Sequence, residues 1–297
     1  MKTRFFSLLL IIFLAAPLWA NDEAESYALI RQAYNDHLFL FVEEKSLDYL
    51  SQSQYDQEGD RAQKVFQYLI GGLMERGAQI QALRYIKEFE TRYEKGSVVW
   101  PSIQFYKAWA LFDAYTDKGL AFPEEYTEIN VSKVLDDVKH SLAPRERMMA
   151  LYKQGQDFFF REYYHEAQKV FSELTKKYLS FRDYENALFY LGKCYFYLPA
   201  PDYNLAIKTF DELIAKRRRS QLLASYYFWK GACLYEKGRL DEAKSIFKDA
   251  LQLDPDKETR VDLYYNLGWL DAAQGKLSSS LAYFEKLTDD DLADVGL

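Results

Sequence analysis

The stretch Ala224–Pro255, ASYYFWKGACLYEKGRLDEAKSIFKDALQLDP, decides the fold of this chain. Its first part predicts a helix over 224–235 that closes at Gly238, because glycine accepts the left-handed backbone found at many helix ends. In its second part, apolar residues follow the spacing of one helix face over 240–253. Asp254-Pro255 then ends that helix. The stretch therefore predicts an antiparallel helical hairpin.

The same pattern recurs along the second half of the chain. Glycine stands at 155, 192, 231 and 268, at intervals of 37, 39 and 37 residues. After each glycine come a small residue and, four positions later, a phenylalanine: Ala167 and Phe171, Ala206 and Phe210, Ala243 and Phe247, Ser280 and Phe284. A fixed period in this range indicates stacked supersecondary units. We expect four such hairpins over residues 145–288.

Composition agrees with an ordered helical chain. Hydrophobic residues make up 49% of the 297 residues, which is enough for a substantial core, and only 7 prolines and 13 glycines are present. The net charge of −7 becomes −9 without residues 1–20, because Lys2 and Arg4 are lost. The bulk charge thus gives no reason to expect nucleic acid or anionic lipid as a partner.

Residues 21–144 are predicted to be helical with a degraded repeat. One hairpin is expected over 22–50 with its turn at Asn35-Asp36, and a second from a helix over 61–75 followed by a helix that carries Ala82, Ile86 and Phe89. A third would join helices over 100–116 and 127–142 through a loop at 117–125. The simplest interpretation is one continuous solenoid, and a break near 141–144 is the alternative.

The two ends of the chain differ from its middle. Residues 1–20 combine Lys2 and Arg4 with an apolar run over 5–14 and small residues before Asn21, the pattern of a cleaved signal peptide. An uncleaved membrane anchor is the alternative. No cysteine follows the run, so lipid attachment is not expected, and no other stretch is long and apolar enough to cross a membrane. Residues 289–297 form a short acidic tail, and little sequence remains to cover the last hairpin.

The hairpin at 224–257 resembles the tetratricopeptide repeat. Gly231, Ala243, Phe247, Ala250 and Pro255 all match that family's pattern in register. The resemblance implies an all-α, right-handed solenoid in which small residues let two helices approach and phenylalanine fills the space between successive hairpins. The other three copies match less completely. The copy around Gly192 has extra residues in its turn, at 198–202.

The resemblance also implies which residues face the concave groove. Ten of the sixteen groove positions are aromatic, against 17% of the chain, and aromatic side chains can anchor a partner while keeping polar atoms hydrated. The alternative is that many of them pack between helices. The candidate partner-binding residues are Tyr152, Phe159, Phe160, Phe189, Lys193, Phe196, Tyr197, Phe228, Tyr235, Tyr265 and Trp269.

Reactive side chains are sparse. His37, His140 and His165 fall in different predicted hairpins, and Lys169 stands where a zinc-protease helix would need a second histidine. No catalytic residue, metal site or cofactor is expected. Cys194 and Cys233 occupy equivalent repeat positions, which lie at least a helix spacing apart, so two free buried thiols are predicted.

The basic cluster at 216–219 is expected at a helix C-terminus, where cations interact favourably with the helix dipole. Docking of an acidic partner or a phosphate there is the alternative.

These patterns predict a non-catalytic scaffold that holds a protein or peptide segment in an aromatic groove. A signal peptide with such repeats resembles exported bacterial proteins that coordinate envelope assembly, such as the periplasmic coordinator of the Tol–Pal system. That resemblance implies a periplasmic protein with an envelope partner. Two alternatives stay open: a repeat portion of a larger enzyme or envelope complex, and a structural protein that self-associates through its C-terminal repeat.

Overall fold

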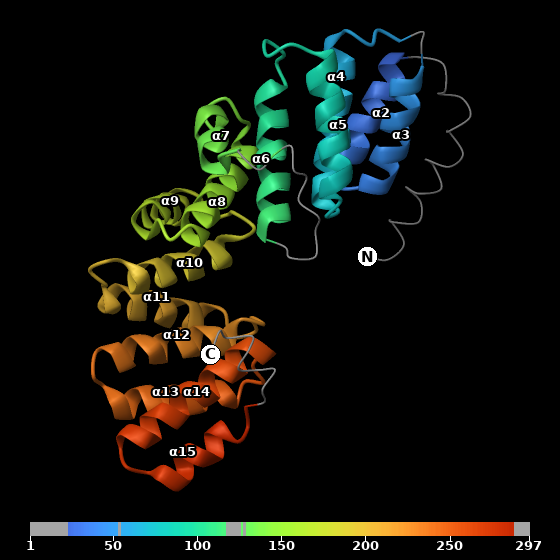
Figure 1. The fold of residues 1–297 in the computed structure, drawn as a ribbon. Helices are drawn as coiled ribbons and strands as arrows, with labels where there is room; N and C mark the ends of the chain where they lie inside the picture. Colours follow the sequence, from blue (N-terminus) through green and yellow to red (C-terminus); the bar gives the residue numbers. More distant parts are fainter. Residues whose placement is uncertain (1–22, 53–54, 117–125, 127–128, 288–297) are drawn as a thin grey trace. The chain divides into compact units, whose positions relative to one another are not determined.

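The computed structural model describes residues 23–52, 55–116, 126 and 129–287, and these residues form fourteen helices and no strand (Figure 1). The predicted signal peptide, the loop at 117–125 and the acidic tail lie outside the described residues. Within the described residues, no helix combines the length and the apolar character that crossing a membrane requires. The predicted all-α fold is confirmed.

The chain divides into two compact units between Lys153 and Gln154. The division falls inside one helix, α8 (Pro144–Phe160), nine residues beyond the boundary placed at 144 from the sequence. Unit 1 comprises residues 1–153 and unit 2 residues 154–297.

Unit 1 consists of helical hairpins followed by the first part of α8. Its helices are α2 (Glu23–Asn35), α3 (Phe39–Ser51), α4 (Asp60–Glu75), α5 (Gln79–Arg92), α6 (Trp100–Thr116) and α7 (Val131–Val138). The helix expected over 127–142 is shorter than predicted, because Asn130 caps it by accepting a hydrogen bond from the Lys133 backbone N–H at 3.0 Å. The Arg147 guanidinium donates to the carbonyls of Lys139, His140 and Leu142 and fixes the turn into α8.

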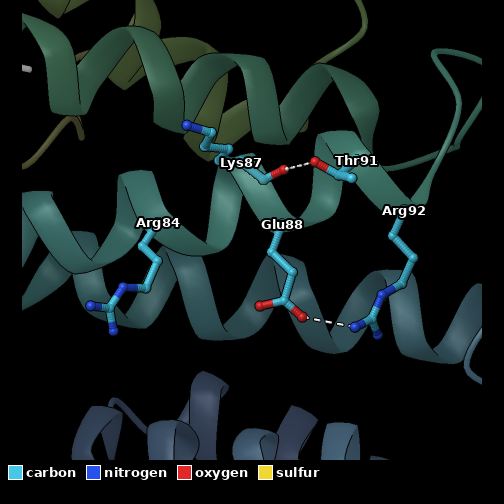
Figure 2. Close-up of a pocket in the computed structure, with 5 residues that line it drawn as sticks. All are labelled: Arg84, Lys87, Glu88, Thr91 and Arg92. Carbon is cyan, nitrogen blue, oxygen red and sulfur yellow. Dashed lines mark hydrogen bonds and ion pairs between the residues drawn. The ribbon is translucent and has the colours of Figure 1, made fainter. Parts of the chain in front are cut away.

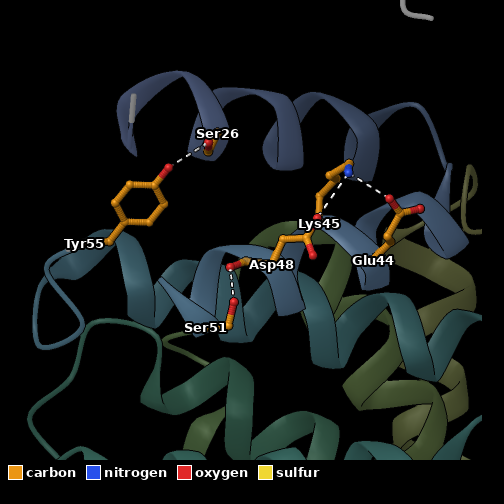
Figure 3. A network of polar contacts seen from close by, with 6 residues as sticks. All are labelled: Ser26, Glu44, Lys45, Asp48, Ser51 and Tyr55. Atoms are coloured by element: carbon orange, nitrogen blue, oxygen red, sulfur yellow. Dashed lines mark hydrogen bonds and ion pairs between the residues drawn. The ribbon is translucent and has the colours of Figure 1, made fainter. Parts of the chain in front are cut away.

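The first hairpin, α2–α3, carries polar contacts on its surface (Figure 3). The hydroxyls of Ser26 and Tyr55 lie 3.3 Å apart, which ties the start of α2 to the chain that follows α3. Lys45 pairs with Glu44 at 2.7 Å and with Asp48 at 3.2 Å. Exposed ion pairs of this kind contribute little to stability, so the buried cluster of Ile30, Val42 and Tyr49 holds the hairpin together.

A polar network joins four helices of unit 1, α2, α4, α6 and α8. The Glu146 carboxylate of α8 accepts hydrogen bonds from Gln67 of α4 at 3.1 Å, Ser102 of α6 at 2.9 Å and Tyr106 of α6 at 3.2 Å. The Tyr106 hydroxyl also lies 3.2 Å from that of Tyr34 in α2. Burial raises the pKa of Tyr106 well above its usual value, so this hydroxyl keeps its proton.

Unit 2 contains the regular repeats. After the end of α8 come α9 (Tyr164–Lys177), α10 (Tyr184–Tyr197), α11 (Tyr203–Lys216), α12 (Leu223–Glu236), α13 (Leu240–Leu251), α14 (Lys257–Ala273) and α15 (Leu277–Phe284). Each helix packs antiparallel to the next (Figure 1). Helix α13 ends two residues before the predicted end, and Asp254 beyond it has a φ of 51°.

The repeated glycines and phenylalanines face each other inside the hairpins of unit 2. A Cβ atom on Gly155, Gly192, Gly231 or Gly268 would lie 2.5–2.8 Å from the ring of Phe171, Phe210, Phe247 or Phe284, respectively. Each ring therefore packs on the glycine of its own hairpin, whereas the sequence interpretation placed it only between hairpins. The Phe171 ring does both, because its centroid also lies 5.3 Å from that of Tyr190 in the next hairpin.

Five hairpin turns share one closure. Residues His37, Gly77, Glu162, Gly238 and Gly275 have φ between 59° and 74°. In each turn the following N–H donates to the carbonyl five residues earlier, as in Arg239 to Leu234 at 2.9 Å. This arrangement satisfies carbonyls left free at the helix end. Two of the five positions lack glycine, so the left-handed turns at His37 and Glu162 were not apparent from the sequence.

Candidate functional site

The first helices of the hairpins form a continuous layer in unit 2. Helix α12 contacts α10 on one side and α14 on the other, besides its hairpin partner α13. The Ser225 and Thr259 hydroxyls bridge α12 and α14 at 2.9 Å. Side chains that recur at one repeat position are thereby brought next to each other on this layer.

An ammonium surrounded by rings marks the centre of this layer. Lys193 Nζ of α10 lies 4.8 Å from the ring centroid of Trp229, 5.1 Å from Phe159, 5.6 Å from Phe189 and 5.9 Å from Tyr190. A cation within about 6 Å of a ring is attracted by the ring's quadrupole. We call these five residues the Lys193 cluster; they come from α8, α10 and α12.

The positive charge of Lys193 is opposed by carboxylates that lie beyond ion-pair distance. In the part of the chain that the structure describes, no carboxylate lies within 4.0 Å of Lys193 Nζ. Burial lowers the pKa of Lys193, and the carboxylates of Glu258 and Asp262 in α14 partly oppose that effect. The cluster is thus a partly desolvated cation that has rings as its immediate neighbours.

Asp262 of α14 is the acidic counterpart of Lys193. Burial raises its pKa to about 6, the neighbouring charges of Glu258 and Asp256 add to the rise, and Lys193 reduces it. A carboxyl group with this pKa changes its charge between mildly acidic and neutral pH. The layer consequently carries one cationic and one titratable anionic side chain among aromatic rings.

Several aromatic side chains beside the cluster remain exposed. Tyr197 of α10 is 39% exposed and stacks on Tyr164 at 5.0 Å, while its ring also lies 5.5 Å from Trp229. Phe160 is 50% exposed. Phe196 packs edge-on against Trp229 at 5.3 Å. Exposed rings held by fixed neighbours can bind a partner with little loss of side-chain entropy.

A second aromatic group lies on the last hairpin. Trp269 of α14 is 52% exposed and lies 5.8 Å from the ring of Phe284 and 6.2 Å from that of Tyr265. Tyr235, at the end of α12, is 37% exposed. We call the Lys193 cluster together with the rings beside it and those of α12 and α14 the aromatic surface: Phe159, Phe160, Phe189, Tyr190, Lys193, Phe196, Tyr197, Trp229, Tyr235, Tyr265 and Trp269.

The predicted site residues fall into three groups. Phe159, Phe160, Phe189, Lys193, Phe196 and Tyr197 are brought together around Lys193, and Tyr265 and Trp269 around Phe284. Phe159 and Phe228 are only 8% exposed, and Phe228 stacks on Phe247 in the core. Tyr152 is buried in unit 1. Phe228 therefore belongs to the core of unit 2, Phe159 is a buried member of the Lys193 cluster, and Tyr152 is not part of the surface.

Sequence reasoning missed Tyr190 and Trp229, which complete the Lys193 cluster. The two residues are 39 positions apart, the same interval that separates Gly192 from Gly231. Asn266 follows Trp229 by 37 positions. Only two of the four copies carry a ring at this repeat position, and the groove positions implied by the resemblance did not include it, so the sequence offered little signal.

Cavities and reactive groups lie elsewhere. A cavity of about 530 Å³ opens on α5 between Arg84, Lys87, Glu88, Thr91 and Arg92 (Figure 2). Glu88 and Arg92, four residues apart on α5, pair along this helix at 2.8 Å. A cavity of about 340 Å³ on α11, α12 and α13 is bordered by the Lys230–Asp211 ion pair at 2.7 Å. In the described residues, no three His, Cys, Asp or Glu side chains are grouped to hold a metal ion.

The two thiols follow the sequence prediction. Cys194 and Cys233 are free and buried, so this prediction is confirmed. Burial raises the pKa of each thiol to about 12, which keeps both protonated and unreactive at neutral pH. They fill small interior positions of α10 and α12.

Comparison with known proteins identifies the repeats. Two tetratricopeptide repeat sequence families match the chain, over residues 186–220 and 221–291. Among curated proteins, none matches the chain. The matched residues include α10 to α15, which carry most of the aromatic surface.

Solved structures show the same fold. The signal-transduction ATPase with a tetratricopeptide repeat sensor from Pyrococcus horikoshii aligns over 94% of this chain and 45% of its own, with 14% identity and a TM-score of 0.59. The apo form of RapI aligns over 89% of this chain and 75% of its own, with 15% identity and a TM-score of 0.57. A Rap protein complexed with competence and sporulation factor covers 92% and 77%, with 13% identity and a TM-score of 0.56.

At these identities the structural likeness concerns the fold alone. The register of the glycines and phenylalanines, the family matches over 186–291 and the hairpin architecture agree with one another. Residues 186–291 of this chain are tetratricopeptide repeats.

Proposed function

We propose that this protein is a non-catalytic scaffold of the bacterial cell envelope that holds a segment of a partner protein against the aromatic surface of unit 2. The observation that carries the proposal is the exposure of Tyr197, Phe160 and Trp269 on one layer of first helices. Large exposed rings are unfavourable in water, and clusters of them are typical of protein-binding surfaces.

The chemistry of the surface suggests how a segment would be held. Tyr197 and Trp269 would supply apolar contact area, while Lys193 and Asp262 would select polar groups on the segment. Preformed helices already fix the rings through stacking, as between Tyr197 and Tyr164 at 5.0 Å. Binding therefore costs these side chains little conformational entropy.

Related folds are compatible with this role. The Rap protein mentioned above was crystallised with competence and sporulation factor, and the Pyrococcus horikoshii protein has a repeat domain described as a sensor. The envelope location rests on residues 1–20, whose basic start, apolar run and small residues follow the pattern of an export signal. We also propose that the protein has no catalytic activity of its own.

Site-specific photo-crosslinking in envelope fractions tests this function. A crosslinking amino acid replaces Tyr197, Tyr235 or Trp269, and Tyr163 serves as the control because it is 57% exposed on the turn between α8 and α9. We expect the same partner to be captured from the three surface positions and not from Tyr163. Equal capture from all four positions would show nonspecific contact.

A double variant provides the complementary loss of function. Tyr235→Ala with Trp269→Ala removes two exposed rings without opening the core. Capture from position 197 should fall at least tenfold, since rings at interface centres dominate binding, while the melting temperature stays within a few degrees. If the folded variant captures the partner as well as the unchanged protein does, Tyr235 and Trp269 do not contribute to partner binding.

Self-association is the second candidate, favoured by the exposed leucines of α15. Leu277 is 71% and Leu281 58% exposed, four residues apart on one helix face. Light scattering over a wide concentration range distinguishes this case. A strict monomer would exclude it, and a dimer lost on Leu281→Ser would support it.

A further inference from the structure

Two neighbouring helix-to-helix connections of unit 2 carry a concentration of basic side chains. Lys176 and Lys177 end α9 and Arg182 follows in the turn to α10, while Lys216 ends α11 and Arg217, Arg218 and Arg219 follow it. Both connections join the second helix of one hairpin to the first helix of the next (Figure 1). We call these seven cations, with Leu179, the basic edge.

Contacts between the turns place them side by side. Arg217 Nε lies 3.2 Å from Oε2 of Glu185 at the start of α10, and the Tyr226 hydroxyl of α12 donates to Glu185 at 2.6 Å. The start of α10 follows directly on the first turn, so the second turn lies next to the first one. The basic edge is therefore one continuous part of the surface of unit 2.

The cations of the edge exceed the carboxylates available to them. Lys177 pairs with Glu173 at 2.9 Å, Arg182 with Asp183 at 3.1 Å, Lys216 with Glu212 at 2.8 Å and Arg217 with Glu185 at 3.2 Å. Within the described residues, Lys176, Arg218 and Arg219 have no carboxylate within 4.0 Å and are exposed. An excess of three positive charges thus faces solvent.

An apolar side chain projects from the same edge. Leu179 lies between Lys177 and Arg182 in the sequence and is 73% exposed, more than any other large hydrophobic residue in the described chain. Leucine is disfavoured in water unless another surface covers it. The edge consequently combines unpaired cations with an exposed apolar group.

We propose that the basic edge binds the surface of an anionic phospholipid membrane. Basic side chains close to such a surface contribute about 1 kcal/mol each, and an apolar side chain among them can enter the headgroup region. Leu179 favours a membrane over an acidic protein, because a bilayer offers an apolar environment to any projecting side chain, whereas a protein would need a pocket matched to it. The chain has a net charge of −7, so attraction to an anionic membrane must come from a local surface.

Sedimentation with vesicles tests the proposal on the full chain. Vesicles of phosphatidylcholine alone are compared with vesicles that also contain phosphatidylglycerol, and the readout is the excess binding to the anionic vesicles. Residues 1–20 carry Lys2, Arg4 and an apolar run, so variants confined to the edge are needed to separate their contribution from that of the edge. We expect a clear excess that disappears at high salt, because exposed charges are then screened.

Variants locate the effect on the edge. Arg218→Gln with Arg219→Gln should reduce the excess about thirtyfold, given the contribution of each basic residue. Leu179→Ser should reduce it about tenfold. The matched control, Lys169→Gln with Lys208→Gln, removes the same charge from exposed positions in the middle of α9 and α11 and should retain the excess.

Three outcomes would overturn the proposal: equal binding to both vesicle types, full binding by the arginine double variant, or an equal loss in the lysine control. Circular dichroism and thermal melting confirm that each variant is folded. None of these substitutions touches the aromatic surface, so partner capture from position 197 should be unchanged. Failure of the membrane proposal is thereby distinguishable from failure of the proposed function.

Discussion

Unit 2 and unit 1 hold neighbouring helices together by different chemistry. In unit 2 a ring lies on a glycine inside each hairpin, as Phe247 does on Gly231. In unit 1, Gly71 faces the hydroxyls of Tyr34 and Tyr106, which lie 2.6 and 2.8 Å from the position of an added Cβ. Those hydroxyls belong to the network around Glu146.

The difference explains why only one unit is regular in sequence. A ring on a glycine is an apolar contact within one hairpin, so it can be repeated at a fixed interval of 37 to 39 residues. The Glu146 network draws its residues from several helices and requires specific donors. Such a network occurs once and leaves no period.

Overpacking the apolar contact should give the largest effect on stability. Gly231→Val places side-chain atoms against the Phe247 ring, which is fully buried, and we expect it to lower the free energy of unfolding by about 3 kcal/mol. Ala232→Val on the same helix adds similar volume at a half-buried position and should cost less than about 1 kcal/mol. Denaturant unfolding measures both.

A double-mutant cycle sharpens this test. Phe247→Leu replaces the ring by a smaller side chain and makes room for the valine. The loss of unfolding free energy in the double variant should therefore be smaller, by more than about 1 kcal/mol, than the sum of the two single losses. Additive costs would show that the valine and the ring do not meet.

Removing the charged acceptor of unit 1 should have the next largest effect. Glu146→Gln replaces a carboxylate oxygen by an amide N–H₂ that faces the donors from Ser102, Gln67 and Tyr106, and we expect a loss of about 2 kcal/mol. Glu173→Gln, in a surface ion pair, should change stability by less than about 0.5 kcal/mol. A loss no larger at 146 than at 173 would mean that the network does not hold unit 1 together.

Replacing Glu162 in its left-handed turn should have a smaller effect, and this change should stabilise the protein. Glu162 has a φ of 64°, a conformation that costs a non-glycine residue about 1 kcal/mol. Glu162→Gly should therefore stabilise the protein by up to about 1 kcal/mol, and Gly238→Ala, at a φ of 73°, should destabilise it by a similar amount. Thermal melts of the two variants check the opposed signs.

Asp262 gives an effect that depends on pH, and it is a polar exception within unit 2. Its pKa is raised by burial to about 6, from an ordinary 3.8, so the folded state binds this proton more tightly than the unfolded chain. Ionisation thus destabilises the fold above about pH 6, and the penalty disappears as the pH falls toward about 4. Asp262→Asn should raise the melting temperature at neutral pH and leave it unchanged near pH 4. A gain of equal size at both values would contradict the assigned shift.

The sequence predicted those features that repeat. The helical hairpins, the closure at Gly238 and the buried free thiols follow from periodicity and residue size, and the structure confirms them. It did not reveal the turns at Glu162 and His37, because each side chain adopts a backbone that its residue type disfavours. Nor did it reveal the Glu146 network, whose members are far apart along the chain.

The candidate site was predicted in outline. Repeat positions located most rings of the aromatic surface, but they could not separate Phe159 and Phe228, which are buried, from Phe160 and Trp269, which are exposed. That distinction depends on how each helix is rotated against its neighbours. The position of Lys193 among four rings likewise requires contacts between α8, α10 and α12.

Amide hydrogen exchange of the protein with and without its crosslink-identified partner tests the central claim most directly. If a partner segment lies on the aromatic surface, exchange should slow in α10, α12 and α14 and stay unchanged in α3 and α5 of unit 1. Slowing confined to unit 1, or to the second helices α9, α11 and α13, would contradict the account.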